Sequence, residues 1–260
     1  MKVITWNVNG LRSVLSKESW LWIEQSDADL IFLQEVKARP EQLSPDQKNK
    51  LASWEVVWNP AVRPGYSGVL TLSRQKGIAS GKGLGRDEFD NEGWVLYSQF
   101  GDVWIFNIYF PNGRHDLSRV PFKMEFYDLL LKQCTDIHQR GGHIILAGDF
   151  NTAHQAIDLR NPKANENATG FLMEERAKID LYLENGFSDI FRDLYPERVQ
   201  YTWWAYHSNA RERGTGWRLD YFLVSKSLIK RVVDVIIHDQ VLGSDHCPVS
   251  LEIDLPLAGF

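Results

Sequence analysis

The stretch His143–Asn151, with the sequence HIILAGDFN, ends an apolar run in an acid and an amide. The run has the length of a buried strand, and Asp149 and Asn151 follow at its end. Similar endings occur at Val3–Asn9, Leu30–Glu35, Trp104–Asn112, Trp217–Tyr221 and Gly243–His246. One such ending is typical of an ordinary turn, but sites are usually built where loops gather above a sheet. We therefore expect these acids and amides to converge.

Short apolar runs and turn signals alternate along the whole chain. The strand candidates are residues 2–8, 29–35, 54–59, 68–73, 77–81, 93–100, 102–109, 142–148, 188–191, 200–204, 218–224, 231–238 and 248–254. Helices are expected near 17–26, 45–52, 121–140 and 173–184. So many strands with so few helices predict two packed sheets with helices outside, a layered α/β sandwich. No repeat or linker divides the chain, so we expect one domain over residues 1–260.

The helix expected over 121–140 has the clearest pattern. One face carries Phe122, Phe126, Leu129, Leu130, Cys134 and Ile137. Proline in its first turn and Gly141–Gly142 after its end are the usual signals of a helix start and stop.

Composition excludes several classes of protein. The 260 residues are 43% hydrophobic and 24% charged, which is typical of a globular chain. No apolar run approaches the ~20 residues of a membrane span, and a strand candidate begins at Lys2, which leaves no room for a signal peptide. We expect a cytoplasmic monomer without a membrane partner. Two cysteines do not support a disulfide framework, and a net charge of −5 argues against binding of nucleic acid through bulk charge alone.

The acids at the strand ends predict a cation site. If Glu35, Asp149 and Asp245 converge, their charges repel, and a divalent cation is the usual remedy. Oxygen ligands without cysteine favour Mg²⁺ or Mn²⁺ over Zn²⁺. His246 follows Asp245, and Asp220 could orient its ring. These residues alone indicate metal-assisted attack on a phosphoester.

Aromatic and basic residues alternate between Trp203 and Arg218. Trp203, Trp204 and Trp217 flank Arg211 and Arg213, and Arg218 follows. Rings and guanidinium groups suit bases and phosphates. A core edge beside a solvated charged loop explains the same pattern equally well, and both interpretations stay open.

Seven motifs together resemble the exonuclease III family of apurinic/apyrimidinic endonucleases. In order, they are Trp6–Arg12, Leu33–Lys37, Gly65–Val69, Tyr109–Gly113, Gly148–His154, Gly216–Tyr221 and Ser244–Pro248. The wider endonuclease/exonuclease/phosphatase superfamily has a four-layered α/β sandwich fold. The resemblance implies Mg²⁺-dependent hydrolysis of duplex DNA on the 5′ side of an abasic site, with 3′-phosphodiesterase activity on blocked 3′ ends and 3′→5′ exonuclease activity. Mn²⁺ could replace Mg²⁺.

The resemblance also implies roles for individual residues. The metal site would contain Glu35 as the principal ligand, with Asn7, Asn9, Asp245, Asp149 and Asn151. Asp149 would activate water or protonate the leaving group, and Asn151 would position the nucleophile. His246, oriented by Asp220, would contact the phosphate, and Tyr109 would support the phosphate or the leaving oxygen. The residues expected to bind DNA or to line the pocket for the flipped sugar are Arg12, Tyr66, Asn112, Asn165, Trp203, His207 and Trp217.

Two positions depart from the family pattern. Asn9 stands where some members have aspartate, which removes a charge from the cation site. Some members have two asparagines three residues apart in this segment. Here Asn165 is the first, and Ala168 stands in place of the second, so the contacts to phosphate could differ there.

Other functions are compatible with parts of the pattern. A nuclease like DNase I, a phosphoinositide phosphatase or a sphingomyelinase would share the catalytic skeleton and differ in substrate. A noncatalytic DNA-binding module would keep the surface without the chemistry. Paired carboxylates and tryptophans also suit a glycosidase, but the Asp245–His246 pair fits phosphate better.

Overall fold

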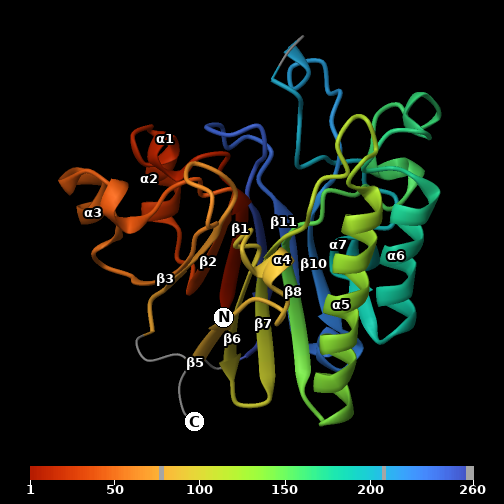
Figure 1. Ribbon diagram of the computed structural model, residues 1–260, viewed down its shortest axis with the longest axis horizontal. Helices are drawn as coiled ribbons and strands as arrows, with labels where there is room; N and C mark the ends of the chain where they lie inside the picture. Colours follow the sequence, from red (N-terminus) through yellow and green to blue (C-terminus); the bar gives the residue numbers. More distant parts are fainter. Residues whose placement is uncertain (76–78, 207–208, 256–260) are drawn as a thin grey trace.

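Two six-stranded sheets lie face to face in the computed structural model, which describes residues 1–75, 79–206 and 209–255 (Figure 1). In spatial order, the first sheet contains β11 (Val232–Ile237), β12 (Val249–Ile253), β1 (Lys2–Asn7), β2 (Leu30–Gln34), β4 (Val69–Ser73) and β3 (Glu55–Asn59). The second contains β5 (Ala79–Lys82), β6 (Val95–Phe100), β7 (Val103–Tyr109), β8 (His143–Asp149), β10 (Asp220–Ser225) and β9 (Phe187–Asp189).

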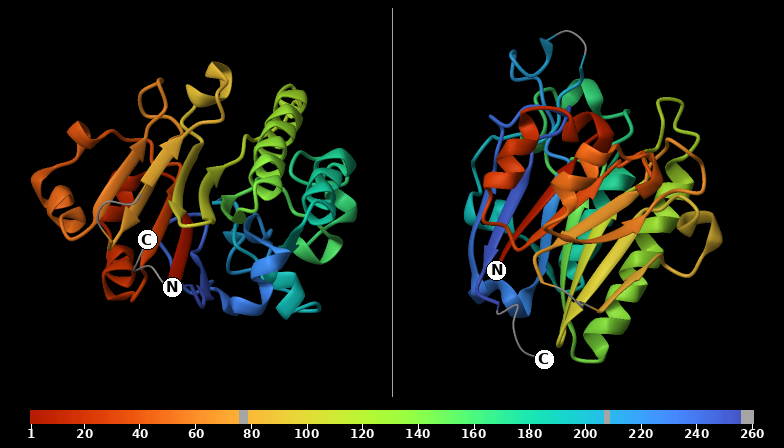
Figure 2. Two further views of the ribbon diagram at one scale, coloured as in Figure 1. Left: turned by 90° about the horizontal axis from the view of Figure 1, so that it is seen from below. Right: turned by 90° about the vertical axis from the view of Figure 1, so that its left-hand side faces the viewer.

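Helices cover the outer faces of the two sheets (Figure 2). The first sheet carries α1 (Leu11–Leu15), α2 (Ser19–Gln25) and α3 (Pro45–Leu51). The second carries α4 (Asp87–Asp90), α5 (Val120–Gln139) and α6 (Met173–Glu184), and α7 (Ile190–Leu194) packs beside β10 and β11. Short 3₁₀ helices are η1 (Pro40–Gln42), η2 (Ala156–Asp158), η3 (Lys163–Asn165) and η5 (Lys226–Arg231). The predicted four-layered α/β sandwich is confirmed.

Successive side chains along each strand point to opposite faces of its sheet, and this alternation produces the layers. Val3 and Ile145 belong to the apolar layer between the sheets. Their chain neighbours Ile4 and Ile144 pack on the outer faces, against α1 and α2 in one case and α5 in the other. Since side chains of successive strand residues point to opposite faces, strands that are apolar at every position are buried on both sides.

The long helix α5 forms as its pattern predicts. Proline occupies its first turn, and Gly141, with a φ of 82°, follows its end. Four of the six expected face residues are fully buried, whereas Phe122 and Leu129 are half-buried. The hydrophobic pattern did not predict that Lys123 and Tyr127 are buried as well.

Two expected strands differ in the structure. Residues 200–204 form no strand. Trp203 makes isolated bridges to Trp217 and His246, because this segment pairs with the segments before β10 and β12 and not with a strand of either sheet. The candidate at 188–191 ends as β9 at Asp189, whose carboxylate accepts a hydrogen bond from the Arg192 backbone N–H and begins α7. Residues 77 and 78 of the candidate 77–81 lie outside the described residues.

The strand topology brings distant polar residues to one edge. The neighbours β1 and β2 run parallel, as do β7 and β8. Asn7 at the end of β1 donates to Asp149 at the end of β8 at 2.8 Å, so both pairs end on the same side. Tyr109 pairs with Asp149, and Asp149 pairs with Asp220 on the antiparallel β10. The predicted convergence of the strand ends is confirmed.

Two further expectations concern the whole chain. Among the described helices, none is both long and apolar enough to cross a bilayer. Cys134 and Cys247 are both free and buried.

Candidate active site

A cavity of about 630 Å³ opens where the two sheets end together. Its walls contain Glu35, Tyr109, Asn112, His115, Asn151, Ala164, Asn167, Ala168, Thr169, Gly170, Trp203, Trp217, Leu219, Asp245 and His246. Asp149 and Asp220 lie beneath His246 and are buried. Both sheets therefore contribute to one acidic site.

Unusual backbone conformations present these side chains. Glu35 and Asn151 both have a φ of 50°, in the left-handed region that few residues other than glycine adopt. Such strain is characteristic of functional sites. Gly148 has a φ of 147°, and a Cβ atom there would lie 1.8 Å from the Ile108 carbonyl oxygen. Only glycine permits this approach of β8 to β7 directly before Asp149.

His246 lies between two buried carboxylates. Its Nδ1 is 2.8 Å from Asp220 Oδ2, and its Nε2 is 3.7 Å from Asp149 Oδ2. Burial alone would lower the pKa of the imidazole, but the two carboxylates outweigh burial and raise this pKa to about 10. The ring is therefore a cation at neutral pH, and its Nε2–H is available to donate to a ligand.

Burial also changes the acidity of Asp149. It raises the pKa of Asp149 to about 7, although the His246 cation acts in the opposite direction. The Asn7 amide donates to Asp149 Oδ2 at 2.8 Å and to Glu35 Oε1 at 3.0 Å. Asp149 is thus a carboxylate that can accept a proton near neutrality, and Asn7 fixes it relative to Glu35.

The oxygen atoms beside Asp149 already surround a positive charge. The Lys37 ammonium contacts Glu35 Oε2 at 2.7 Å and Asn9 Oδ1 at 2.5 Å. Asn9 in turn donates to Asp245 Oδ1 at 3.0 Å. Carboxylate and amide oxygens that converge on a cation are the donors that Mg²⁺ prefers. The residues present therefore fit a hard divalent ion near Glu35, Asn9 and Asp245.

A second group of possible ligands is less suitable. Asp149, Asp220 and His246 offer atoms within 4.8 Å of one another. A protonated imidazole cannot bind a metal ion, and the hydrogen bond to Asp220 occupies its Nδ1. The oxygen atoms of Glu35, Asn9 and Asp245 are therefore the better-suited donors for a divalent cation.

Asn151 and Tyr109 complete the polar floor of the cavity. Asn151 Nδ2 donates to the Phe110 carbonyl at 2.8 Å, and Asn112 Nδ2 donates to Asn151 Oδ1 at 3.2 Å. Burial, together with the charges of Glu35 and Asp149, raises the pKa of Tyr109 well above its usual value. The Tyr109 hydroxyl therefore keeps its proton and can donate.

Aromatic rings form the apolar side of the cavity. Trp203 and Trp217 meet nearly edge to face, with ring centroids 6.3 Å apart. Trp203 Nε1 donates to Asp245 Oδ2 at 3.2 Å, which links the rings to the acids. Leu219 lies beside them. These side chains form an apolar surface next to the polar floor, and a small, flat portion of a ligand fits against it.

The remaining residues expected to contact DNA are placed differently. Arg12 is exposed on α1. Tyr66 is half-buried, and its hydroxyl accepts a hydrogen bond from Arg119 at 3.1 Å. Neither lines the cavity. His207 lies outside the described residues.

The cavity wall differs from the expectation at Asn165. The Asn165 amide donates to the Asn161 carbonyl at 2.7 Å, and Asn165 does not line the cavity. Asn167–Gly170, here called the wall loop, lines it instead. Because the turn at η3 directs Asn165 back onto its own loop, sequence position alone did not predict which asparagine faces the cavity.

The interpretation of Arg218 as a group for phosphate is wrong. Arg218 is buried and binds Asp158 and Asp189 through four hydrogen bonds of 2.6–3.1 Å. Arg211 stacks on Trp204, 4.4 Å from its ring centre, and donates to backbone carbonyls. For Trp204, Arg211 and Arg218, the core-edge interpretation is therefore the right one.

Sequence reasoning missed His115, Asn167, Thr169 and Leu219 in the cavity, and Lys37 beside Glu35. Lys37 lies two positions after Glu35 and shares its left-handed backbone, with a φ of 50°. No hydrophobic period or turn signal marks that geometry.

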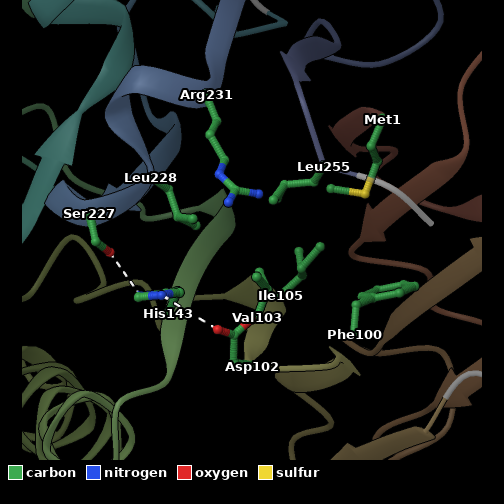
Figure 3. Close-up of a pocket in the computed structure, with 10 residues that line it drawn as sticks. All are labelled: Met1, Phe100, Asp102, Val103, Ile105, His143, Ser227, Leu228, Arg231 and Leu255. Carbon is green, nitrogen blue, oxygen red and sulfur yellow. Dashed lines mark hydrogen bonds and ion pairs between the residues drawn. The ribbon is translucent and has the colours of Figure 1, made fainter. Parts of the chain in front are cut away.

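Another cavity, of about 520 Å³, lies at the far end of the sheets (Figure 3). Figure 3 shows Arg231 above an apolar floor, with His143 between Ser227 and Asp102. Among the described residues that line it, Asp102 is the only acid, so this cavity lacks the converging carboxylates of the first.

The fold and the site together define a class of protein. Two packed sheets whose shared edge holds an oxygen-rich cation site beside a carboxylate–imidazole pair are the framework of a hydrolase that acts on phosphoesters. Residues 4–246 match the endonuclease/exonuclease/phosphatase family. The chain belongs to this family, and the resemblance seen in its motifs is confirmed.

Comparison with individual proteins agrees with this assignment. The chain is 43% identical to an exodeoxyribonuclease of Bacillus subtilis (strain 168), over 98% of the chain and 100% of the relative. It is 37% identical to the DNA repair nuclease APEX1 of Danio rerio, over 96% of the chain and 81% of the relative. The AP endonuclease LMAP from Leishmania major has a similar structure, with a TM-score of 0.88, 29% identity, and coverage of 98% of this chain and 88% of that one. The 3′ phosphatase NExo from Neisseria, bound to product DNA hairpin, also has a TM-score of 0.88, with 28% identity and coverage of 98% and 100%.

Proposed function

We propose that the protein is a Mg²⁺-dependent DNA repair nuclease that hydrolyses the phosphodiester 5′ to an abasic site in duplex DNA. It also acts as a 3′-phosphodiesterase on blocked 3′ ends and as a 3′→5′ exonuclease on duplex DNA. The observation that carries this proposal is the position of the Trp203–Trp217 rings in the same cavity as His246 and Asp245, with the Trp203 and His246 ring centroids 6.5 Å apart. The names of the relatives support the same substrate.

The side chains have complementary tasks in this reaction. Asp149 accepts the proton of the attacking water, which its pKa of about 7 allows. His246 donates from Nε2 to a phosphate oxygen, and Asp220 holds the opposite ring nitrogen. Tyr109 and the Asn151 amide donate to the charge that develops on phosphorus oxygens. Donors that are already in place stabilise this charge more than they stabilise the ground state.

The cation belongs to the acidic side of the site. Glu35, Asn9 and Asp245 would hold Mg²⁺, with Asn7, Asp149 and Asn151 close by. When bound, the ion neutralises phosphate charge and acts as a Lewis acid. Lys37 would then exchange its contact with Glu35 for another partner.

Selectivity follows from the apolar side of the cavity. A nucleotide without a base has lost its stacking and pairing, so its extrusion from the duplex costs little. Trp203, Trp217 and Leu219 would receive the bare sugar. The protein has a net charge of −5, so affinity for the DNA backbone must come from local contacts. Arg12, Tyr66, Asn112 and His115 are our candidates for these contacts.

A direct assay tests this function. A duplex with one tetrahydrofuran abasic analogue is incubated with the protein in Mg²⁺ and in EDTA, beside intact duplex and a duplex with a 3′-phosphate. We expect Mg²⁺-dependent incision on the 5′ side of the analogue and release of the 3′-phosphate. Equal cleavage of intact duplex would instead indicate a nuclease like DNase I. Binding without cleavage in Mg²⁺ would indicate a noncatalytic module.

A further inference from the structure

A buried ion pair lies next to Asn151, outside the residues that line the cavity. The Lys123 ammonium, from α5, is 2.7 Å from Glu175 Oε1, from α6, and neither side chain is exposed to solvent. Apolar side chains of similar volume often stabilise a fold as well as a buried ion pair does. The other hydrogen bonds of Lys123 and Glu175 therefore indicate what this ion pair contributes besides stability.

Lys123 fixes the backbone of Asn151. Its Nζ donates to the Asn151 carbonyl oxygen at 2.7 Å. The Asn151 N–H donates to Asp149 Oδ1 at 2.8 Å, so the same residue also holds the carboxylate that we assign as the base. Because Asn151 has a φ of 50°, its conformation needs support from surrounding contacts.

Glu175 accepts hydrogen bonds from the loop that forms the cavity wall. Its Oε2 accepts hydrogen bonds from the Gly170 and Leu172 backbone N–H groups at 2.5 and 3.1 Å, and its Oε1 accepts one from Thr169 Oγ1 at 2.9 Å. Thr169 and Gly170 belong to the wall loop. One ion pair thus joins the polar floor of the cavity to its wall.

The wall loop also packs closely on the residue that Lys123 holds. A Cβ atom at Gly170 would lie 3.2 Å from the Asn151 carbonyl oxygen and 3.3 Å from the Trp217 ring. The Gly170 carbonyl accepts a hydrogen bond from the Ala153 N–H at 2.8 Å. A small shift of the wall loop would therefore displace Asn151 as well.

We propose that Lys123 and Glu175 are positioning residues for the reaction: they hold Asn151 and the wall loop at a fixed separation, so that a nucleotide against the wall lies in line with the Asn151 amide and Asp149. Neither side chain touches the substrate. This inference rests on the proposed function, because it assigns a task within that reaction.

The test removes both charges together. Lys123→Met combined with Glu175→Gln leaves no unpaired buried charge, so the fold should be retained. Misplacement of reacting groups by about 1 Å can cost about 10²-fold in rate. We expect kcat for incision of the tetrahydrofuran duplex to fall about 10²-fold, whereas KM and the affinity for the duplex should change less than about threefold.

A double-mutant cycle separates positioning from general destabilisation. Because the pair positions the Asn151 amide as well as Asp149 and the wall loop, the loss in kcat should be clearly smaller in an Asn151→Ala background. Leu130→Ala, which truncates a buried residue of α5 outside the site, is the control for lost stability. It should lower the Tm and leave kcat unchanged well below that temperature.

Three results of these kinetic measurements would contradict the proposal. The proposal is overturned if the charge-free variant keeps full kcat, if its loss is the same in the Asn151→Ala background, or if Leu130→Ala loses kcat equally. If circular dichroism finds the double variant unfolded, Lys123→Gln combined with Glu175→Gln, which also carries no charge and keeps hydrogen-bond donors and acceptors at both positions, enters the same cycle with the same expectations. An unmodified protein that does not incise the abasic duplex contradicts the proposed function itself.

Discussion

At the scale of single residues, the central feature is an imidazole held between two carboxylates. Asp220 contacts one ring nitrogen of His246, and Asp149 lies near the other. Their charges raise the pKa of His246, while burial raises that of Asp149. The base is thus deprotonated, and the donor still protonated, in one window of pH.

This window predicts the pH dependence of incision. Activity should rise as Asp149 loses its proton, with a pKa of about 7 that a bound cation would lower, and should fall as His246 loses its proton near a pKa of about 10. Single-turnover rates on the tetrahydrofuran duplex across pH measure both limbs. A rate that stays constant from acid to strongly alkaline pH would contradict the assignment.

Both groups make the fold less stable as pH rises, because the pKa of each is higher in the folded protein. The pKa of His246 is higher in the folded protein than its ordinary 6.5, so its contribution is complete below 6.5 and is lost as pH rises through about 10. The folded pKa of Asp149 is also raised, so burial of its carboxylate destabilises the fold increasingly as pH rises from 3.8 to about 7.

Asp220→Asn tests how His246 is held. The amide keeps a similar shape but removes one of the two charges that raise the imidazole pKa, so the alkaline limb should move toward neutral pH. We expect the rate at neutral pH to fall about 10²- to 10³-fold, the usual cost of one misplaced donor. An unchanged alkaline limb would mean that Asp220 does not set the charge of His246.

At the scale of elements, the parallel pairs β1–β2 and β7–β8 carry the site. Asn7 and Glu35 come from the ends of one pair, and Tyr109 and Asp149 from the ends of the other. Close approach of β7 and β8 depends on Gly148.

Gly148→Ala should therefore destabilise the second sheet. The new methyl group would collide with the Ile108 carbonyl oxygen, at a cost of about 3 kcal/mol and a fall in Tm of roughly 6–12 °C. Gly141→Ala is the matched control, since Gly141 also has a positive φ but has open space around it. It should cost only about 1 kcal/mol. Similar thermal denaturation curves for the two variants would contradict the steric explanation.

At the scale of the whole molecule, the site exists only because two sheets meet. Glu35 and Asp245 lie at the ends of strands of the first sheet, and Asp149 and Asp220 on strands of the second. A cation held by these oxygens would bind the folded protein and not the unfolded chain, and would therefore stabilise it.

Glu35→Gln tests this stabilisation without an activity assay. Saturating MgCl₂ should raise the Tm of the unmodified protein by roughly 5–11 °C, as expected for a ligand about 100-fold above its Kd, which contributes about 2.7 kcal/mol. The variant should lose most of this rise. A Tm that Mg²⁺ raises equally in both proteins would place the ion elsewhere.

The sequence predicts the layered fold and most of the acidic site, because strand ends are local features that sheet topology brings together. It does not predict that Arg218 and Lys123 are buried in ion pairs. Arg218 pairs with Asp158 and Asp189, and Lys123 pairs with Glu175, and these partners are distant in the chain. The sequence also does not predict that Asn167 and not Asn165 lines the cavity, because this depends on a short turn and not on a hydrophobic period.

The most direct test of a shared acidic site is the fate of the attacking oxygen. The unmodified protein would incise the tetrahydrofuran duplex in isotopically labelled water with Mg²⁺, and mass spectrometry would locate the label. We expect one labelled oxygen on the 5′-phosphate of the downstream product and a free 3′-hydroxyl upstream, with no product from Asp149→Asn. A 3′-phosphate, an unlabelled 5′-phosphate or full activity of Asp149→Asn would contradict this expectation.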